Sequence, residues 1–252
     1  MSGQPLAGRV AVVTGGAGGL GSAICRALAA AGAAVVVGYH ASAEAAHRLA
    51  AELPAAELAH AAMPLPVTDS TALVEQATII ERTYGRCDVL VNNAGTTRFV
   101  AHADLDGLDD ALFDRIFATN VRGALAMVRT LRPLLEREGS GLVVNISSIA
   151  ARTAMGSNLA YCASKAALDN LTLSLARALA PRIRVVGVAP GLADTEFVAG
   201  LDRAWRDEQA ARTPLQRLAR AEEVAAAVLA LATQLTFTTG AVIPVDGGRP
   251  LA

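Results

Sequence analysis

Short Val-rich stretches alternate with helical stretches along the whole chain of 252 residues. The short stretches are apolar almost throughout, as expected for strands that are covered on both faces. Parallel strands joined by right-handed helical crossovers satisfy this pattern. No internal repeat or linker-like stretch divides the chain. The sequence therefore predicts one α/β domain over residues 1–252, with a doubly wound parallel sheet of about seven strands and helices on both faces.

The alternation also predicts where each element lies. We expect strands at residues 9–13, 34–38, 58–63, 88–91, 141–146, 183–188 and 241–245. We expect helices at residues 20–31, 42–53, 69 or 70 to 84, 108–138, 158–179 and 221–232. Pro133 should kink the long helix at 108–138, because proline removes a backbone donor. In such a sheet, ligands bind beyond the carboxyl ends of the strands.

The composition argues against several classes of function. Apolar residues make up 53% and charged residues 18% of the chain, which suits a large core rather than disorder. With 22 basic and 23 acidic residues the formal charge is −1, so charge gives no reason to expect nucleic acid or an anionic membrane. The longest apolar run, residues 27–38, is well short of the ~20 residues of a membrane-spanning helix.

The cysteines, the histidines and the first residues complete this interpretation. Cys25, Cys87 and Cys162 are far apart, as buried thiols in a reducing compartment are, and four scattered histidines predict no metal site. Residues 1–8 show no charged and apolar leader. We expect a cytoplasmic protein that acts on a small molecule.

A glycine-rich turn at residues 14–21 lies between the first strand and the first helix. Gly15 permits a tight turn, Gly19 lets the backbone approach a pyrophosphate, and Gly21 lets the helix pack close to the sheet. Backbone N–H groups around Leu20, with the positive end of the helix dipole, then face the anion. A turn of this kind at this place predicts a dinucleotide site.

The spacing T-G-x-x-x-G-x-G resembles that of the short-chain dehydrogenase/reductase family, and further motifs follow in the family's order over about residues 7–249. They are Asn92-Asn93-Ala94-Gly95, Asn120, Ser148, Tyr161 with Lys165, Pro190-Gly191 with Thr195, and Asp246-Gly247-Gly248. The resemblance implies a Rossmann-like fold and an oxidoreductase that transfers a hydride between a nicotinamide cofactor and a ketone or secondary alcohol. Within the family, the chain is most similar to the 3-oxoacyl-carrier-protein reductase type.

The predicted catalytic residues are Asn120, Ser148, Tyr161 and Lys165. Tyr161 and Lys165, four residues apart on a helix, share one face. We expect the Lys165 ammonium and an oxidised nicotinamide to lower the pKa of Tyr161, so that it acts as acid and base. Ser148 would hold the substrate oxygen. An ordinary amphipathic pair is the alternative, but Lys165 is the sole lysine of the chain. The resemblance implies two more roles: Lys165 binds the nicotinamide ribose, and Asn120 holds a water molecule in a proton relay.

The end of the second strand distinguishes NADP from NAD. A carboxylate there binds the ribose hydroxyls of NAD and repels the 2′-phosphate of NADP. Tyr39 stands at this position, followed by His40 and Ser42, and the first carboxylate is Glu44. An arginine that would bind the phosphate is also missing. We favour NADP(H), with NAD(H) as the alternative; His40 is either a phosphate ligand or only solvated.

The other predicted contacts follow the strands. The remaining cofactor contacts are Val67, Asn93, Ala94, Gly95, Pro190, Gly191 and Thr195, and Val67 follows Pro66, where the family usually has an acid or an amide. The substrate candidates are Arg98, Ser148, Arg152, Met155, Tyr161, Leu192 and Phe197, and the family places a substrate lid at about 192–216. Arg98 and Arg152 either recognise a carboxylate or are solvated cations.

Three functions agree with these residues. The first is an NADPH-dependent reductase of a 3-oxoacyl group or a similar ketone. The second is an NAD-dependent dehydrogenase of a sugar, polyol or cyclic alcohol. The third is a non-catalytic nucleotide-binding protein, against which the filled catalytic positions argue. The resemblance also implies a homotetramer that pairs through residues 108–138 and 158–180. Leu168, Leu171, Leu175 and Leu179 form a stripe on the second of these helices, but such a stripe is ordinarily core.

Overall fold

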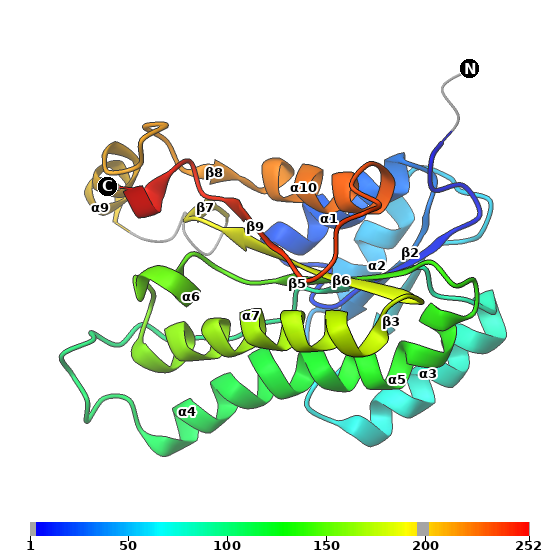
Figure 1. The fold of residues 1–252 in the computed structure, drawn as a ribbon, viewed down its shortest axis with the longest axis horizontal. Helices are drawn as coiled ribbons and strands as arrows, with labels where there is room; N and C mark the ends of the chain where they lie inside the picture. The colour runs from blue at the N-terminus through cyan, green and yellow to red at the C-terminus, as the bar shows by residue number, and fades with distance from the viewer. Residues whose placement is uncertain (1–3, 196–201, 252) are drawn as a thin grey trace.

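A seven-stranded parallel sheet forms the centre of the computed structural model, which describes residues 4–195 and 202–251 (Figure 1). The strand order is β3-β2-β1-β4-β5-β6-β9. The strands are β1 (Val10–Val13), β2 (Ala34–Tyr39), β3 (Ala61–Pro64), β4 (Val89–Asn92), β5 (Gly141–Ile146), β6 (Ile183–Pro190) and β9 (Val242–Val245). Because the order reverses between β1 and β4, the sheet is doubly wound, which confirms the predicted fold class. A separate two-stranded pair joins β7 (Ala193–Asp194) to β8 (Ala219–Arg220).

Helices cover both faces of this sheet. The helices of the described residues are α1 (Gly19–Ala30), α2 (Ala43–Glu52), α3 (Ser70–Tyr84), α4 (Asp110–Phe117), α5 (Ala124–Glu136), α6 (Ala150–Thr153), α7 (Leu159–Leu179), α9 (Arg203–Ala211) and α10 (Ala221–Thr233). Two short turns, the π-helical η1 (Ala118–Gly123) and the 3₁₀ turn η2 (Arg249–Leu251), complete the list. None of the described helices is long and apolar enough to cross a bilayer.

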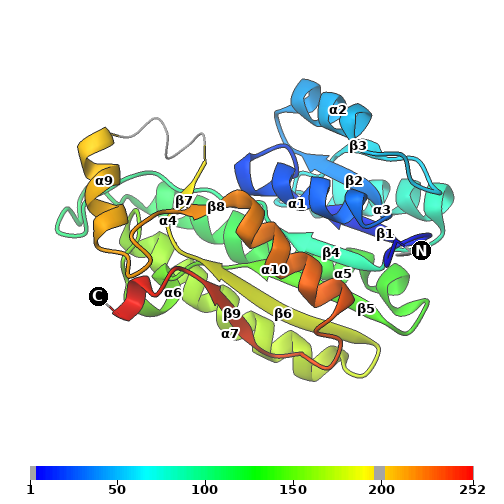
Figure 2. The ribbon, with the colours of Figure 1, turned by 90° about the horizontal axis from the view of Figure 1, so that it is seen from above.

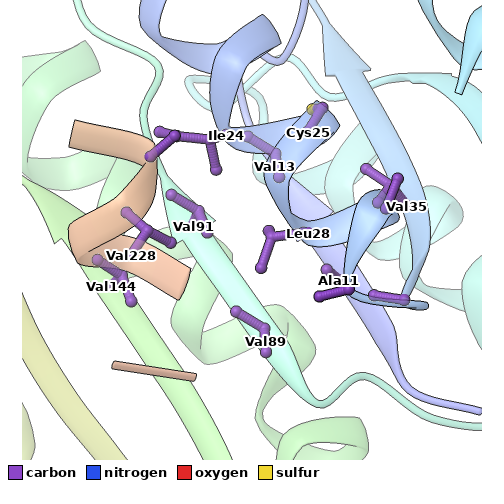
Figure 3. Close-up of a cluster of buried hydrophobic side chains, with 14 of the residues drawn as sticks. Ala11, Val13, Ile24, Cys25, Leu28, Val35, Val89, Val91, Val144 and Val228 are labelled. Atoms are coloured by element: carbon purple, nitrogen blue, oxygen red, sulfur yellow. The ribbon is translucent and has the colours of Figure 1, made fainter. Parts of the chain in front are cut away.

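The side chains of each strand alternate between two cores. Val13 and Val91 point to the face covered by α1, α2 and α10, where they meet Ile24 and Val228 (Figure 3). The intervening residues, such as Val12, point to the opposite core against α3, α5 and α7. Figure 2 shows α1 and α10 side by side over the sheet. Each fully buried aliphatic side chain contributes about 1.5–3 kcal/mol. Because both faces of the sheet are covered by apolar cores, the strand sequences are nearly unbroken apolar runs rich in Val.

Capping residues set the bounds of α3 as the sequence predicts. The Asp69 carboxylate accepts hydrogen bonds from the backbone N–H groups of Thr71 (3.0 Å) and Ala72 (3.1 Å). Gly85 ends the helix with a φ of 70°, a left-handed conformation that glycine adopts without strain.

The prediction of one long helix at 108–138 is wrong in detail, because the structure divides this stretch into α4, η1 and α5. The regular hydrogen bonding is interrupted at η1, around Asn120, and α5 continues past Pro133. Single π turns within helices are frequent at functional sites. The apolar pattern runs through η1 without a break, so it gives no sign of this change.

The leucine stripe on α7 faces the core. Leu168 and Leu179 are buried, and Leu175 packs against the core that includes α5. Residues 192–216, the predicted lid, contain β7 and α9. Residues 196–201, with the candidate Phe197, lie outside the described part of the chain.

Candidate active site

A cavity of about 1320 Å³ lies at the carboxyl ends of the central strands. It is lined by Gly15 after β1, Asn93 after β4, Ser148 after β5 and Gly191 after β6. The segments that meet there are far apart in sequence, and the parallel sheet alone brings their ends together. This is the edge at which doubly wound sheets bind their ligands.

The glycine turn forms one wall of the cavity and leaves no room for a side chain at Gly15 or Gly21. Gly15 has a φ of 60°, and a Cβ added to it would lie 3.2 Å from Cα of Ala94. A Cβ added to Gly21 would lie 2.2 Å from the carbonyl oxygen of Gly15. Helix α1 begins after Gly18, which supplies no side-chain cap. The N–H groups of its first turn therefore remain available to an anion.

Asn93 and Thr14 lock this turn to the end of β4. The Asn93 amide donates to the backbone oxygens of Thr14 (3.0 Å) and Gly15 (2.9 Å). The Thr14 hydroxyl in turn accepts from the backbone N–H groups of Asn93 and Ala94, both at 3.0 Å. The glycine turn at residues 14–21, called the glycine cradle below, is thus already ordered before any ligand binds.

Nearly all the predicted cofactor contacts line this one cavity. They are Gly15, Gly19, Leu20, Gly21, Tyr39, His40, Ser42, Val67, Asn93, Ala94, Gly95, Tyr161, Pro190, Gly191 and Thr195. Lys165, the one remaining contact, lies buried behind the cavity wall with 6% of its surface exposed. No Asp or Glu occurs among the described lining residues. A long cavity with a glycine cradle and no carboxylate fits a dinucleotide, whose charge is negative.

Ser148 and Tyr161 face the cavity from two different elements. Tyr161 lies in the first turn of α7, and Lys165 is one turn further on, with Nζ 5.7 Å from the centre of the Tyr161 ring. The Lys165 ammonium donates to the carbonyl oxygen of Ile146 at the end of β5 (2.7 Å). Ser148 follows this strand, and its hydroxyl accepts from the N–H of Ala150 (3.1 Å). The structure therefore places all three side chains around one corner of the cavity.

Burial dominates the electrostatics of this corner. It raises the pKa of Tyr161, and the hydrogen bond with Ser148 acts in the opposite direction. Burial also lowers the pKa of Lys165 to about 8, against the effect of the nearby Asp169 carboxylate. The pKa of Tyr161 is thus raised rather than lowered as expected, because loss of water outweighs the hydrogen bond with Ser148.

Asn120 links the loop after β4 to α7. Its side chain is 2% exposed, and its Oδ1 accepts from the backbone N–H of Thr96 (2.8 Å). Its amide donates to the carbonyl oxygen of Thr96 and to the Ser164 hydroxyl, both at 3.1 Å. A Cβ added to Gly95 would lie 3.4 Å from Asn120 Oδ1 and 3.9 Å from Lys165 Nζ. Asn120 is therefore beside Lys165 but does not line the cavity.

Asn158 was not anticipated, although it caps the helix that carries Tyr161. Its Oδ1 accepts from the backbone N–H of Tyr161 (2.7 Å). Its amide donates to the Thr97 hydroxyl (3.1 Å) and to the carbonyl oxygen of Arg98 (2.6 Å). An asparagine just before an apolar helical pattern is the signal that could have identified it.

The structure separates the predicted substrate residues into two groups. Met155 and Leu192 line the cavity together with Ser148 and Tyr161. Arg98 and Arg152 lie outside it: both are exposed, and Arg98 donates to the carbonyl oxygen of Gly107 (2.7 Å). Their positions in sequence, close to the strand ends, did not determine the direction of their side chains.

Other arginines, which the sequence did not single out, reach the cavity. Arg212 lies at the end of α9 and Arg249 follows the closing Gly-Gly pair, and both line it, as does Gln209. No sequence signal pointed to them, because α9 and the chain end meet only in the fold.

A doubly wound sheet with a glycine turn at this cavity is the architecture of a dinucleotide-binding protein. Residues 15–249 match the family described as Enoyl-(Acyl carrier protein) reductase. The chain is 42% identical over 249 residues to cis-4-hydroxycyclohexanecarboxylate dehydrogenase of Sinomonas cyclohexanicum, with 98% of each chain covered. It is 35% identical over 245 residues to 3-oxoacyl-(acyl-carrier-protein) reductase FabG of Thermotoga maritima, with 96% of this chain and 98% of the relative covered.

A solved structure shows the same architecture. The crystal structure of a short-chain dehydrogenase/reductase, described as glucose/ribitol dehydrogenase, from Brucella melitensis superposes with a TM-score of 0.89 at 29% identity. The superposition covers 97% of this chain and 98% of the other. The protein belongs to the short-chain dehydrogenase/reductase family, which confirms the resemblance found in the sequence.

Proposed function

We propose that this protein is an NADPH-dependent reductase of a 3-oxoacyl group or a similar ketone. One observation carries the proposal: Ser148 and Tyr161 line the same cavity as the glycine cradle, with Lys165 buried behind the phenol. When bound, the nicotinamide supplies or accepts the hydride. The residues of the chain must then orient the carbonyl and supply its proton.

Tyr161 is the proton donor in this proposal. Because burial raises its pKa, the phenol carries its proton at neutral pH and is ready to donate it to the substrate oxygen. The Ser148 hydroxyl donates to the same oxygen as negative charge develops there. The Lys165 ammonium then stabilises the phenolate from 5.7 Å behind the ring.

Asn120 supports the return of the proton. Both amide N–H groups and one lone pair of its Oδ1 are engaged by Thr96 and Ser164. The second lone pair of Oδ1 is the place for a relay water, since an amide oxygen accepts two hydrogen bonds.

The choice of NADP(H) rests on the end of β2. Tyr39, His40 and Ser42 line the cavity, and no described carboxylate faces it there. A 2′-phosphate would meet hydrogen-bond donors there and no negative charge that repels it.

An NAD-dependent dehydrogenase of a cyclic alcohol is the second candidate. A specific observation favours it: the relative at 42% identity is named cis-4-hydroxycyclohexanecarboxylate dehydrogenase. Comparing kcat/KM for NADPH-linked reduction of ketones with kcat/KM for NAD-linked oxidation of cyclic alcohols distinguishes the two.

The decisive variant is Tyr161→Phe. We expect its kcat to fall by about 10²–10⁴-fold, as loss of general acid catalysis predicts, with the Kd for NADPH nearly unchanged. The assay is a panel of ketones and secondary alcohols with both cofactors, followed by fluorescence titration of NADPH. A variant that keeps more than a tenth of the wild-type kcat removes Tyr161 from the chemistry. No turnover of the wild type on any carbonyl would favour a binding protein without activity.

We also propose a cytoplasmic homotetramer. Apolar side chains that could pair copies are exposed on α4, α5 and α7: Phe113 (41%), Leu125 (39%) and Leu173 (50%). Light scattering should give about four times the 25.8 kDa of one chain, and a monomer mass would overturn this proposal.

A further inference from the structure

The charges around the cavity are all of one sign. Arg115, Arg212 and Arg249 line it, and no acidic side chain of the described residues does. The glycine turn and His40 line it from the ends of β1 and β2. Arg212 and Arg249 instead come from α9 and η2, which lie beside each other at the end of the molecule near α6 (Figures 1 and 2).

Two glycines direct Arg249 toward α9. Gly247 and Gly248 have φ values of 62° and 79°. A Cβ added to Gly247 would lie 2.8 Å from Cγ2 of Thr213, and one added to Gly248 would lie 3.1 Å from Cγ of Pro214. The chain end can therefore pack against the segment after α9 only because both positions lack a side chain. This packing leaves Arg249 with 7% of its surface exposed, at the cavity wall.

The contacts of Arg249 hold its guanidinium but do not neutralise it. Its two terminal nitrogens donate to the backbone oxygen of Arg212 (3.1 Å) and to Oε1 of Gln209 (2.9 Å). Both acceptors are uncharged, and no described carboxylate forms an ion pair with Arg249. A buried cation is costly unless an anion accompanies it. Two of its five N–H groups are used by these acceptors, so others remain for a ligand.

The neighbours of Arg249 are also donors. An arginine can only donate, so the Gln209 atom that faces it is the oxygen, and the Gln209 NH₂ group is left to donate elsewhere. Arg212 is paired with Glu208 at 3.5 Å, but its side chain is 56% exposed and Glu208 does not line the cavity. Trp205 lines the same wall and has only an N–H to offer. This wall of the cavity therefore favours a ligand that carries hydrogen-bond acceptors and a negative charge.

We propose that the substrate carries a carboxylate that binds to Arg249 and Arg212 while its carbonyl lies at Ser148 and Tyr161. A guanidinium matches a carboxylate in two parallel hydrogen bonds, which also fixes the orientation of the substrate. The proposal rests on the proposed function for the position of the carbonyl, and it goes beyond it by naming an oxo acid or hydroxy acid as the substrate class. The site replaces Arg98 and Arg152, which the sequence had suggested for a carboxylate and which lie outside the cavity.

The first part of the test measures binding, without turnover. The full-length enzyme is saturated with NADP⁺ and titrated calorimetrically with a series of oxo acids, from 4-oxopentanoate to 7-oxooctanoate, and with the methyl ester of each. The series covers different spans between the ketone and the charge. For the best-fitting length we expect the acid to bind about tenfold to a hundredfold more tightly than its ester, because the ester has no charge and cannot form the paired, charge-assisted hydrogen bonds with a guanidinium.

Variants locate the effect. Arg249→Met should abolish the preference for the acid and leave the Kd of the ester and of NADPH unchanged. Arg212→Met should reduce the preference for the acid severalfold. This variant keeps the hydrogen bond that holds Arg249 to the end of α9, because Arg249 donates to the backbone oxygen of Arg212 and not to its side chain. Arg203→Met is the matched control, an exposed arginine of α9 that does not line the cavity, and it should behave as wild type. Thermal melting checks that each variant is folded.

The opposing outcomes are distinct. If wild type binds acid and ester equally at every length, or if Arg249→Met weakens both equally, Arg249 only tethers α9 and the proposal is overturned. Should Arg249→Met not fold, an unchanged preference in Arg212→Met has the same meaning. A weaker Kd for NADPH in these variants would assign the arginines to the cofactor. Turnover is measured separately. Acids that bind but are never reduced would contradict the proposed reductase activity and leave the carboxylate site standing. Esters that are reduced as well as the acids would contradict only the carboxylate site.

Discussion

Gly21→Ala tests whether the cradle depends on the close approach of α1 to the turn after β1. A Cβ at this position would lie 2.2 Å from the carbonyl oxygen of Gly15 and 2.9 Å from Cα of Gly16. Both distances are far below the ~3.5 Å of an ordinary contact. Because both neighbours are backbone atoms, the helix and the turn must move apart; no side chain can rotate away.

The cost of this movement can be estimated. Overpacking of this kind costs about 1–3 kcal/mol, and the better helix propensity of alanine returns at most about 1 kcal/mol. A net loss of about 1–2 kcal/mol lowers Tm by roughly 2–8 °C for a chain of this size. A displaced turn also loses at least one hydrogen bond to the pyrophosphate, worth about 1.5–3 kcal/mol, so the Kd for NADPH should rise tenfold or more.

Gly18→Ala is the matched control within the same turn. Gly18 has a φ of −78°, which any residue adopts, and a Cβ there would meet only the Gly15 oxygen, at 3.4 Å. Alanine is a poorer N-cap than glycine, which costs below about 1 kcal/mol. Calorimetric Tm values and fluorescence titration of NADPH compare the two variants with wild type. Equal NADPH affinity for Gly21→Ala and wild type, or equal damage from both substitutions, would refute the steric reasoning.

Three further predictions address charge and buried polarity. Burial lowers the pKa of Lys165 from 10.5 to about 8, so the unfolded chain binds more protons between these values and wild-type stability should rise with pH across this window. Lys165→Met should therefore be more stable than wild type below pH 8, by roughly 2–4 kcal/mol, with a difference that shrinks toward pH 10.5 in urea denaturation curves. Tyr39→Asp places a carboxylate where the 2′-phosphate of NADP would lie. It should raise the Kd for NADPH by about tenfold to a hundredfold at low salt and by less at high salt, and it should leave the Kd for NADH unchanged. If the wild type binds NADH more tightly than NADPH, the reasoning about β2 is wrong. Thr172→Val removes the acceptor of the buried Asn145 amide (2.8 Å) and should cost about 1–3 kcal/mol by urea denaturation, and an unchanged midpoint would show that a water molecule replaces the hydroxyl.

The sequence by itself determined the fold class and the dinucleotide cradle. Both depend on local patterns: runs of Val predict strands, and Gly15 and Gly21 after β1 occupy positions where no other side chain fits. The Y-x-x-x-K spacing likewise placed Tyr161 and Lys165 on one face of α7, because four residues make about one helical turn.

Only the tertiary structure decided which other side chains reach the cavity. Arg98 and Arg152 follow motif residues but do not line the cavity, whereas Arg249 reaches it from the last turn, η2. The π turn around Asn120 was equally invisible, because the apolar pattern runs through it unchanged and the Asn120 side chain binds Thr96, which lies in another segment. The shift in the pKa of Tyr161 also comes from burial, which depends on what surrounds the phenol. A sequence pattern encodes relations within one element, but the direction of a loop side chain and its loss of water result from contacts between elements.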